Sequence, residues 1–356
     1  MDLIAIIELL GESMTLALGG LVIGILFGAL AQRSRFCLRA ATIEFRQGNL
    51  GGKVAVWVLA FSAAVAFTQG AILIGFLDVS EARQLAATGS VSGAIIGGLM
   101  FGVGMILARG CASRLLVLSA TGNMRAFVSG LILTIVAQAS LRGALSPARE
   151  FLSSLWMIQG GETRNLLALA NASTLIGTLL GVVWLTIGIW LARRNNIAKS
   201  VALSAAGVGA AIALGWIFTY TMSQISFEPV STKSISFTGP SADTLMGLIS
   251  TRTLPIGFDI GLVPGVFLGS LVASLIAREF KYQRFDETSG MMRYIVGASL
   301  MGFGGMLAGG CAVGAGVTGS AIFALTSWMA LVSMWVAAML TGYLMNSNPE
   351  HKKVPA

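Results

Sequence analysis

Apolar residues fill most of the chain in stretches near 20 residues, and shorter polar segments separate them. Because a transmembrane helix needs about 20 consecutive apolar residues, these stretches predict helices that cross a bilayer. The polar segments are too short to hold a separate soluble domain, so residues 1–356 are expected to form a single membrane domain. Nine helices are predicted, over 14–31, 54–77, 93–108, 126–141, 173–192, 200–219, 260–277, 291–308 and 321–345.

The basic residues between the stretches predict how the chain is oriented. Lys and Arg follow the odd-numbered stretches, whereas the segments after even-numbered stretches carry a more balanced charge, such as Asp78, Glu81 and Arg83. Cytoplasmic loops carry an excess of Lys and Arg, so the N-terminus is predicted outside and the C-terminus in the cytoplasm. The basic residues include Arg33, Arg39 and Lys53 after the first stretch, Arg109, Arg114 and Arg125 after the third, and Arg193, Arg194 and Lys199 after the fifth.

A motif occurs three times, and each copy ends on one of the three cysteines. Phe-Gly or Met-Gly is followed, after eight further residues, by Cys37, Cys111 or Cys311. The second and third copies lie 200 positions apart and agree closely. The shared residues are Gly97, Gly102, Gly104, Leu107, Ala108, Gly110, Cys111 and Ala112, repeated at Gly297, Gly302, Gly304, Leu307, Ala308, Gly310, Cys311 and Ala312.

The two matched copies, which end at Cys111 and Cys311, indicate an internal symmetry of the chain. The stretch before Cys111 is predicted to run inward and the stretch before Cys311 outward, so the matched sequences predict an inverted repeat. Its halves would be 14–165 and 200–345, joined by the helix 173–192. The apolar runs after Cys111 and Cys311 are too short to cross, which favours re-entrant loops that meet at mid-membrane. The segment 221–259 is expected to be partly re-entrant.

Composition narrows the classes of function. The chain is 55% hydrophobic and 11% charged, whereas soluble domains carry about 25% charge. The net charge of +8 fits basic loops beside a lipid bilayer better than binding to nucleic acid. The sole histidine, His351, lies in the tail, which argues against His-based catalysis and most metal sites. No cofactor, no metal site and no enzymatic activity are predicted.

The cysteine motifs supply the candidate chemistry. If a short helix begins after each cysteine, its N–H groups face the thiol and favour an anion. Cys111 and Cys311 are then expected to meet at the centre of the substrate pathway. The candidate anion-binding loop residues are Gly110, Ala112, Ser113, Gly309, Gly310, Ala312 and Val313. Helix packing by the glycines and a simple apolar role for each cysteine are the alternative interpretations.

Three arginines lie close to the first two cysteines and could attract an anion to the pathway. Arg35 and Arg109 each precede a cysteine by two positions, and Arg114 follows Cys111 by three. The alternative is that these side chains only anchor the cytoplasmic ends of the helices.

The three motifs, the duplication and the nine predicted spans resemble the YeeE/YedE family of sulfur-compound transporters. The resemblance rests on Arg35-Phe36-Cys37, Gly110-Cys111-Ala112 and Gly309-Gly310-Cys311-Ala312. It implies an hourglass-shaped protein of the bacterial inner membrane, in which Cys111 and Cys311 pass the anion along and Cys37 is a third station. A small cytoplasmic sulfur carrier of the TusA type is an implied partner. Arg109 departs from the family, which usually has Gly-Gly-Cys here.

Uptake of a small sulfur-containing anion, most of all thiosulfate, is therefore the predicted function. Transport of another sulfur or selenium species, such as sulfite, sulfide or a persulfide, is the alternative. A membrane thiol sulfurtransferase is a weaker hypothesis, because the sequence offers no general base beside the thiols.

Overall fold

The chain folds almost entirely into helices, as a computed structural model of residues 3–250, 256–284 and 290–347 describes it. The elements are α1 (Leu3–Leu10), α2 (Glu12–Ser34), α3 (Leu38–Arg46), α4 (Gly52–Leu73), α5 (Arg83–Ala86), β1 (Gly89–Ser90), α6 (Val91–Leu107), α7 (Ala112–Ala120), α8 (Met124–Arg142), α9 (Ser146–Ser154), β2 (Met157–Ile158), η1 (Glu162–Arg164), α10 (Leu166–Leu169), α11 (Thr174–Arg194), α12 (Lys199–Ile225), α13 (Thr238–Ser250), α14 (Phe258–Ile276), α15 (Met291–Leu307), the π-helix η3 (Gly314–Gly319) and α16 (Leu325–Ser347).

Each of the nine predicted stretches corresponds to a helix, from α2 for 14–31 to α16 for 321–345. Eight segments of the described chain are long and apolar enough to cross a membrane. The remaining stretch is α15, which has 17 residues and so lies at the short end of the range for a spanning helix. The protein is a multi-pass membrane protein, and the predicted all-α membrane fold is confirmed.

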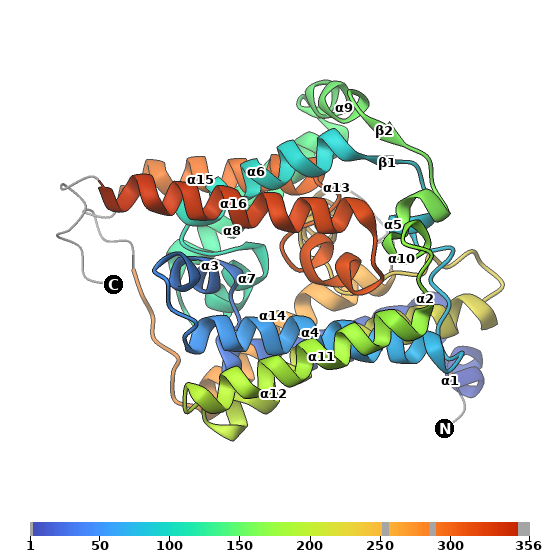
Figure 1. Cartoon of the computed structure of the whole chain (residues 1–356). Helices are drawn as coiled ribbons and strands as arrows, with labels where there is room; N and C mark the ends of the chain where they lie inside the picture. Colours follow the sequence, from blue (N-terminus) through green and yellow to red (C-terminus); the bar gives the residue numbers. More distant parts are fainter. Residues whose placement is uncertain (1–2, 251–255, 285–289, 348–356) are drawn as a thin grey trace.

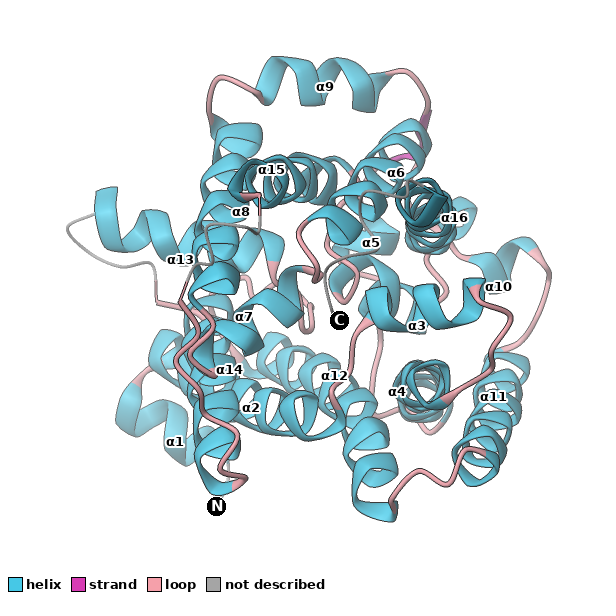
Figure 2. Cartoon of the chain, turned by 90° about the vertical axis from the view of Figure 1, so that its left-hand side faces the viewer, coloured by secondary structure: helices cyan, strands magenta, loops and turns pink. Residues whose placement is uncertain are grey.

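The long helices form two layers with short helices between them (Figure 1). One layer contains α6, α8, α15 and α16, and the other contains α2, α4, α11, α12 and α14 (Figure 2). The short helices α3 and α7 and the π-helix η3 lie between the layers. Each layer thus combines helices from both predicted halves.

The contact between α6 and α15 is reciprocal. A Cβ added to Gly97 would lie 2.5 Å from the Ala308 nitrogen, and one added to Gly297 would lie 2.6 Å from the Ala108 nitrogen. The start of each helix therefore meets the end of the other, and the two matched sequences run antiparallel. This arrangement is compatible with the predicted inverted repeat, which stays a prediction, as do the boundaries of its halves.

Glycines also bring α2 and α14 together. A Cβ added to Gly24 would lie 2.5 Å from the Leu262 carbonyl oxygen, and one added to Gly265 would lie 2.4 Å from the Leu21 carbonyl oxygen. Gly98 likewise packs on the Ala330 carbonyl of α16. These contacts fit the packing interpretation for Gly24 and Gly98, because small residues let membrane helices approach closely.

Two segments outside the long helices contain more structure than the sequence pattern predicts. Residues 143–172 form α9, β2, η1 and α10, and β2 pairs with β1 in an antiparallel two-stranded sheet. The segment between α12 and α13 is irregular yet buried at Ser234, Ile235 and Phe237. Its burial is compatible with the expected re-entrant course, which remains a prediction. The predicted cytoplasmic tail with His351 lies outside the described residues.

Candidate functional site

The same turn precedes all three cysteines. Arg35, Arg109 and Gly309, each two positions before a cysteine, have φ values of 53°, 57° and 78°. In each turn the next residue donates its N–H to a carbonyl five positions earlier, as Gly310 does to Gly305 at 2.8 Å. This is the left-handed ending of a helix in which glycine is the least strained residue. Arginine therefore occupies a glycine-like conformation twice.

Each cysteine then begins the next turn of helix. The carbonyls of Cys37, Cys111 and Cys311 accept from the N–H groups of Ala41, Leu115 and Ala315 at 3.2, 2.9 and 2.8 Å. At Cys311 the Gly314 N–H also donates to the sulfur at 3.4 Å. The prediction that a short helix starts at Cys111 and Cys311 is thus confirmed, with η3 as a π-helix rather than an α-helix.

The structure brings two of the thiols together, those of Cys37 and Cys111. The two buried thiols lie close enough to influence each other electrostatically. The Ser113 hydroxyl lies 3.3 Å from the Cys111 sulfur, so a third polar group joins the pair. Both cysteines lie next to the positively charged ends of α3 and α7, which favours an anion beside their sulfur atoms.

Cys311 follows the other helix of the α6–α15 contact. Because Ala308 packs at Gly97 and Ala108 at Gly297, the cysteines that follow them lie toward opposite ends of the α6–α15 contact. The 11-residue step from Gly97 to Ala108 corresponds to about 16 Å of helix. No hydrogen bond joins the Cys111 and Cys311 sulfurs among the described residues, and their meeting at the centre of the pathway stays a prediction. Cys37, expected as a third station, interacts with Cys111.

A cavity of about 420 Å³, here called the basic cavity, opens beside Cys37. Five of its lining side chains are basic, and no carboxylate lines it within the described part of the chain. Such a cavity attracts anions because the positive charges add in a confined space. The basic residues are Arg35, Arg39, Lys53, Arg109 and Arg114.

Two of these arginines hold unused hydrogen-bond donors near the thiols. Arg114 Nη1 and Arg39 Nε are buried and have no hydrogen-bond partner among the described residues. A buried donor without a partner is costly, so an anion that accepts from it binds favourably. Arg35 differs, since it forms a 3.1 Å ion pair with Glu279 at the exposed rim.

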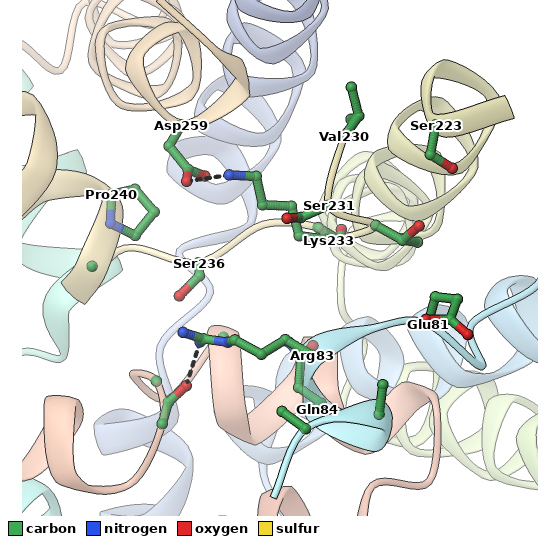
Figure 3. A pocket seen from close by; sticks show the side chains of 18 of the residues that line it. Glu81, Arg83, Gln84, Ser223, Val230, Ser231, Lys233, Ser236, Pro240 and Asp259 are labelled. Carbon is green, nitrogen blue, oxygen red and sulfur yellow. Dashed lines mark hydrogen bonds and ion pairs between the residues drawn. The ribbon is translucent and has the colours of Figure 1, made fainter. Parts of the chain in front are cut away.

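A second cavity of about 1050 Å³, here called the large cavity, lies at the other end of α4 (Figure 3). Gly52 at the start of α4 lines the basic cavity, and Asp78, beyond its end, lines the large one. The 22 residues of α4 span about 33 Å. Gly309, Gly310 and Gly314, on either side of Cys311, line the large cavity.

Tightly packed side chains close the route between the two cavities. Cys111 and Cys311 are 1% and 0% exposed and belong to one buried cluster with Phe27 and Phe237. The rings of Phe27 and Phe237 lie 5.3 Å apart. Ala112, Ala312 and Val313 are buried as well. Gly110 is also closely packed, since a Cβ added to it would lie 3.3 Å from the Leu115 side chain. Passage therefore requires these side chains to move.

Several charged residues of the cavities were not singled out by the sequence. Arg39 and Lys53 were interpreted only as basic loop residues, and Arg83 as part of a balanced loop with Asp78 and Glu81. Lys233 was not singled out either, whereas the sequence left Asp259 open between a loop charge and a gating partner. The two form a 2.6 Å ion pair in the large cavity. Their 26-residue separation gave no signal, because the fold alone brings these segments together.

Comparison with known proteins identifies the family. The model of the Sulphur transport family matches residues 33–340. The chain belongs to the Sulphur transport family. It is 26% identical over 358 residues to the thiosulfate transporter TsuA of Escherichia coli (strain K12), covering 95% of this chain and 97% of the relative. It is 27% identical over 335 residues to the TsuA of Spirochaeta thermophila (strain ATCC 700085 / DSM 6578 / Z-1203), covering 88% and 94%.

The family confirms the resemblance to sulfur-compound transporters that the cysteine motifs indicated. Both relatives are named as transporters of thiosulfate, and neither name describes an enzyme. The protein is therefore a transporter-family member whose three motif cysteines occupy equivalent positions in three similar turns.

Proposed function

We propose that this protein carries a small sulfur-containing anion, most of all thiosulfate, inward across the bacterial inner membrane. The supporting observation is the set of three cysteines at helix starts, distributed between two cavities at opposite ends of α4. The large cavity receives the anion from outside, and Cys311 lies beneath it. The Cys111–Cys37 pair then delivers the anion to the basic cavity.

The chemistry of the route suits thiosulfate. Its terminal sulfur is soft and accepts S–H hydrogen bonds, while its oxygen atoms accept from guanidinium and backbone N–H groups. The buried free donors of Arg39 and Arg114 lie where an anion would leave the thiol pair. Since thiols, amides and cations act only by binding, no bond of the cargo has to break.

Orientation and partner belong to the same proposal. The basic cavity has five cationic side chains and faces the cytoplasm under the positive-inside rule, which leaves the N-terminus outside. A TusA-type sulfur carrier would dock at the mouth of this cavity, where the intact anion is released. Mixing purified carrier with the transporter in nanodiscs should give saturable binding that Arg35→Glu weakens, and no binding would remove the carrier from the proposal.

The test of transport is uptake of radiolabelled thiosulfate by proteoliposomes. Cys111→Ala removes the sulfur that links Cys37 to the buried route, and a hydrogen bond to a charged group contributes about 1.5–3 kcal/mol. Uptake is therefore expected to fall by about 10- to 100-fold. Ser119→Ala, a change of similar size further along α7, is the control and should leave uptake near the original rate.

Two results would contradict the proposal. Wild-type vesicles that accumulate no thiosulfate would exclude this cargo, and Cys111→Ala vesicles with undiminished uptake would exclude the thiol route. Competition by unlabelled sulfite, sulfide or selenium compounds then decides between thiosulfate and the alternative cargoes.

A further inference from the structure

The large cavity contains more acidic than basic side chains, so most of its charge does not favour an anion. Its carboxylates are those of Asp78, Glu81, Asp243 and Asp259, and its basic residues are Arg83, Arg149 and Lys233. A divalent anion that enters this cavity therefore needs a cation that the carboxylates leave free.

Two of the three cations are already neutralised. Lys233 Nζ lies 2.6 Å from Asp259 Oδ2, and Arg149 Nη2 lies 3.3 Å from Glu150 Oε1. Arg83 has no carboxylate partner in the part of the chain that the structure describes. Its side-chain contact there is a 3.5 Å approach of Nη2 to the Gly309 carbonyl oxygen. Arg83 is therefore the cation most available to an incoming anion.

Arg83 is also directed at the Cys311 loop. Figure 3 shows its side chain crossing the cavity toward the side where Ser236 lies, with a dashed contact to the loop. Ser236 Oγ would lie 2.2 Å from a Cβ added to Gly314, whose N–H donates to the Cys311 sulfur. The guanidinium and the hydroxyl thus border one region of the cavity, and the buried Cys311 thiol lies behind Gly314.

A buried arginine holds Arg83 in place from behind. Arg164 donates to the carbonyl of Arg83 at 3.3 Å and to that of Ala87, and its other terminal nitrogen donates to Thr326 Oγ1 at 2.7 Å. Burial and the nearby charge of Arg83 lower the pKa of Arg164. Arg164 adds a second positive charge near Arg83, and an anion beside them reduces their mutual repulsion.

We infer that Arg83 is a specificity-determining residue of the large cavity, where it binds the oxygen end of a sulfur oxyanion. The sulfur end then points to Cys311. Bidentate contact between a guanidinium and two oxygen atoms fits a tetrahedral sulfur oxyanion. This inference rests on the proposed function, since it places the same anion one step before Cys311 on the route.

The experiment measures binding and uptake of labelled thiosulfate and sulfate by the full chain in proteoliposomes. Arg83→Gln should raise the half-saturating concentration of both anions about tenfold or more, because both present oxygen atoms. Its maximal uptake rate for thiosulfate should stay near that of the wild type. Cys311→Ala should weaken the binding of thiosulfate and leave the binding of sulfate unchanged, since sulfate has no terminal sulfur.

Arg149→Gln is the matched control, because it removes the same charge from the same cavity. It should change half-saturation by less than about twofold, as expected for a cation already paired at the surface. Arg83→Lys should bind with intermediate affinity and melt at the wild-type temperature, which separates recognition from folding.

Three outcomes would overturn the inference: unchanged half-saturation in Arg83→Gln, equal weakening in Arg149→Gln, or a wild-type protein that binds neither anion. Wild-type protein that binds both anions but transports neither would instead refute the proposed function. In that case the binding affinities of the Arg83 variants still decide the role of Arg83.

Discussion

At the scale of single residues, the turns before the cysteines combine backbone strain with charge. A non-glycine residue in the left-handed region costs about 1–2 kcal/mol. Arg35 and Arg109 both adopt it, and both side chains line the basic cavity. A cation is thus held in a place where glycine would be more stable, which supports a role for the charge itself.

Replacing Arg109 by glycine tests this separation of strain from charge. Arg109→Gly should raise the free energy of unfolding by up to about 1 kcal/mol, because the strain disappears while the unfolded chain gains some freedom. Thermal unfolding in detergent measures the change. Arg114→Gly should instead lower the free energy of unfolding by about 1 kcal/mol or more, because Arg114 lies inside α7, where glycine is a poor helix former. An Arg109→Gly protein that unfolds more readily than the wild type would contradict the strain argument.

The sequence identified these residues but not their contacts. Cys37, Cys111 and Cys311 were found because each ends the same motif, and the left-handed turn follows from the glycine at 309. The pairing of Cys111 with Cys37 could not be predicted, since it depends on how α2 and α6 are placed relative to each other. Arg83 gave no signal because its neighbours in sequence, Glu81 and Asp78, made the loop look balanced.

At the scale of elements, close contacts between antiparallel helices determine where the cysteines lie. A Cβ on Gly104 would lie 2.5 Å from the Gly297 carbonyl oxygen, and one on Gly304 would lie 2.7 Å from that of Gly97. These neighbours are backbone atoms, so the helices would have to separate to admit a side chain. Since Cys111 and Cys311 follow these helices directly, separation would also move both thiols.

Gly104→Ala is therefore expected to lower stability by about 1–3 kcal/mol, the usual range for overpacking. Gly130→Ala is the control, because an added Cβ on that helical glycine meets nothing within 4 Å. Alanine is the better helix former, so the control should gain up to about 1 kcal/mol. Equal thermal midpoints for the two variants would show that the α6–α15 contact is looser than described.

At the scale of the whole molecule, the two cavities differ in charge, and the difference suits inward movement of an anion. The large cavity mixes carboxylates with cations, whereas the basic cavity has five cations and no carboxylate in its described lining. On the proposed route, an anion would move from a region of mixed charge to a strongly positive one. The mixed charge of the large cavity also makes capture sensitive to pH.

Asp243 is the group expected to carry this pH dependence. Burial and the neighbouring Asp259 raise the pKa of Asp243, while the charges of Arg142, Lys233 and Arg83 oppose the rise. Asp78 and Glu81 also face the large cavity. The pKa of Asp243 is thus higher in the folded protein than in the unfolded chain, so its deprotonation lowers the free energy of unfolding. This loss is absent below the unfolded pKa and is complete once the pH has risen above the folded pKa.

The same proton affects anion binding. Protonated Asp243 removes a negative charge, so half-saturation for thiosulfate should improve as external pH falls through the raised pKa of this carboxyl. Asp243→Asn should bind more tightly at neutral pH and show a flatter pH profile between pH 7 and the acidic range. Uptake measured at several external pH values checks this, and an Asp243→Asn profile parallel to that of the wild type would exclude Asp243.

The sequence by itself determined the membrane class, the nine helices, the cysteine motifs and the family. These features depend on local composition and spacing, which hydrophobic burial and backbone hydrogen bonding convert directly into helices. Only the tertiary structure decided that Cys111 interacts with Cys37, that the loop of Cys311 borders the large cavity, and that Arg83 is the cation of that cavity without a carboxylate partner among the described residues. Those facts depend on contacts between segments far apart in the chain, and side-chain packing alone sets such contacts.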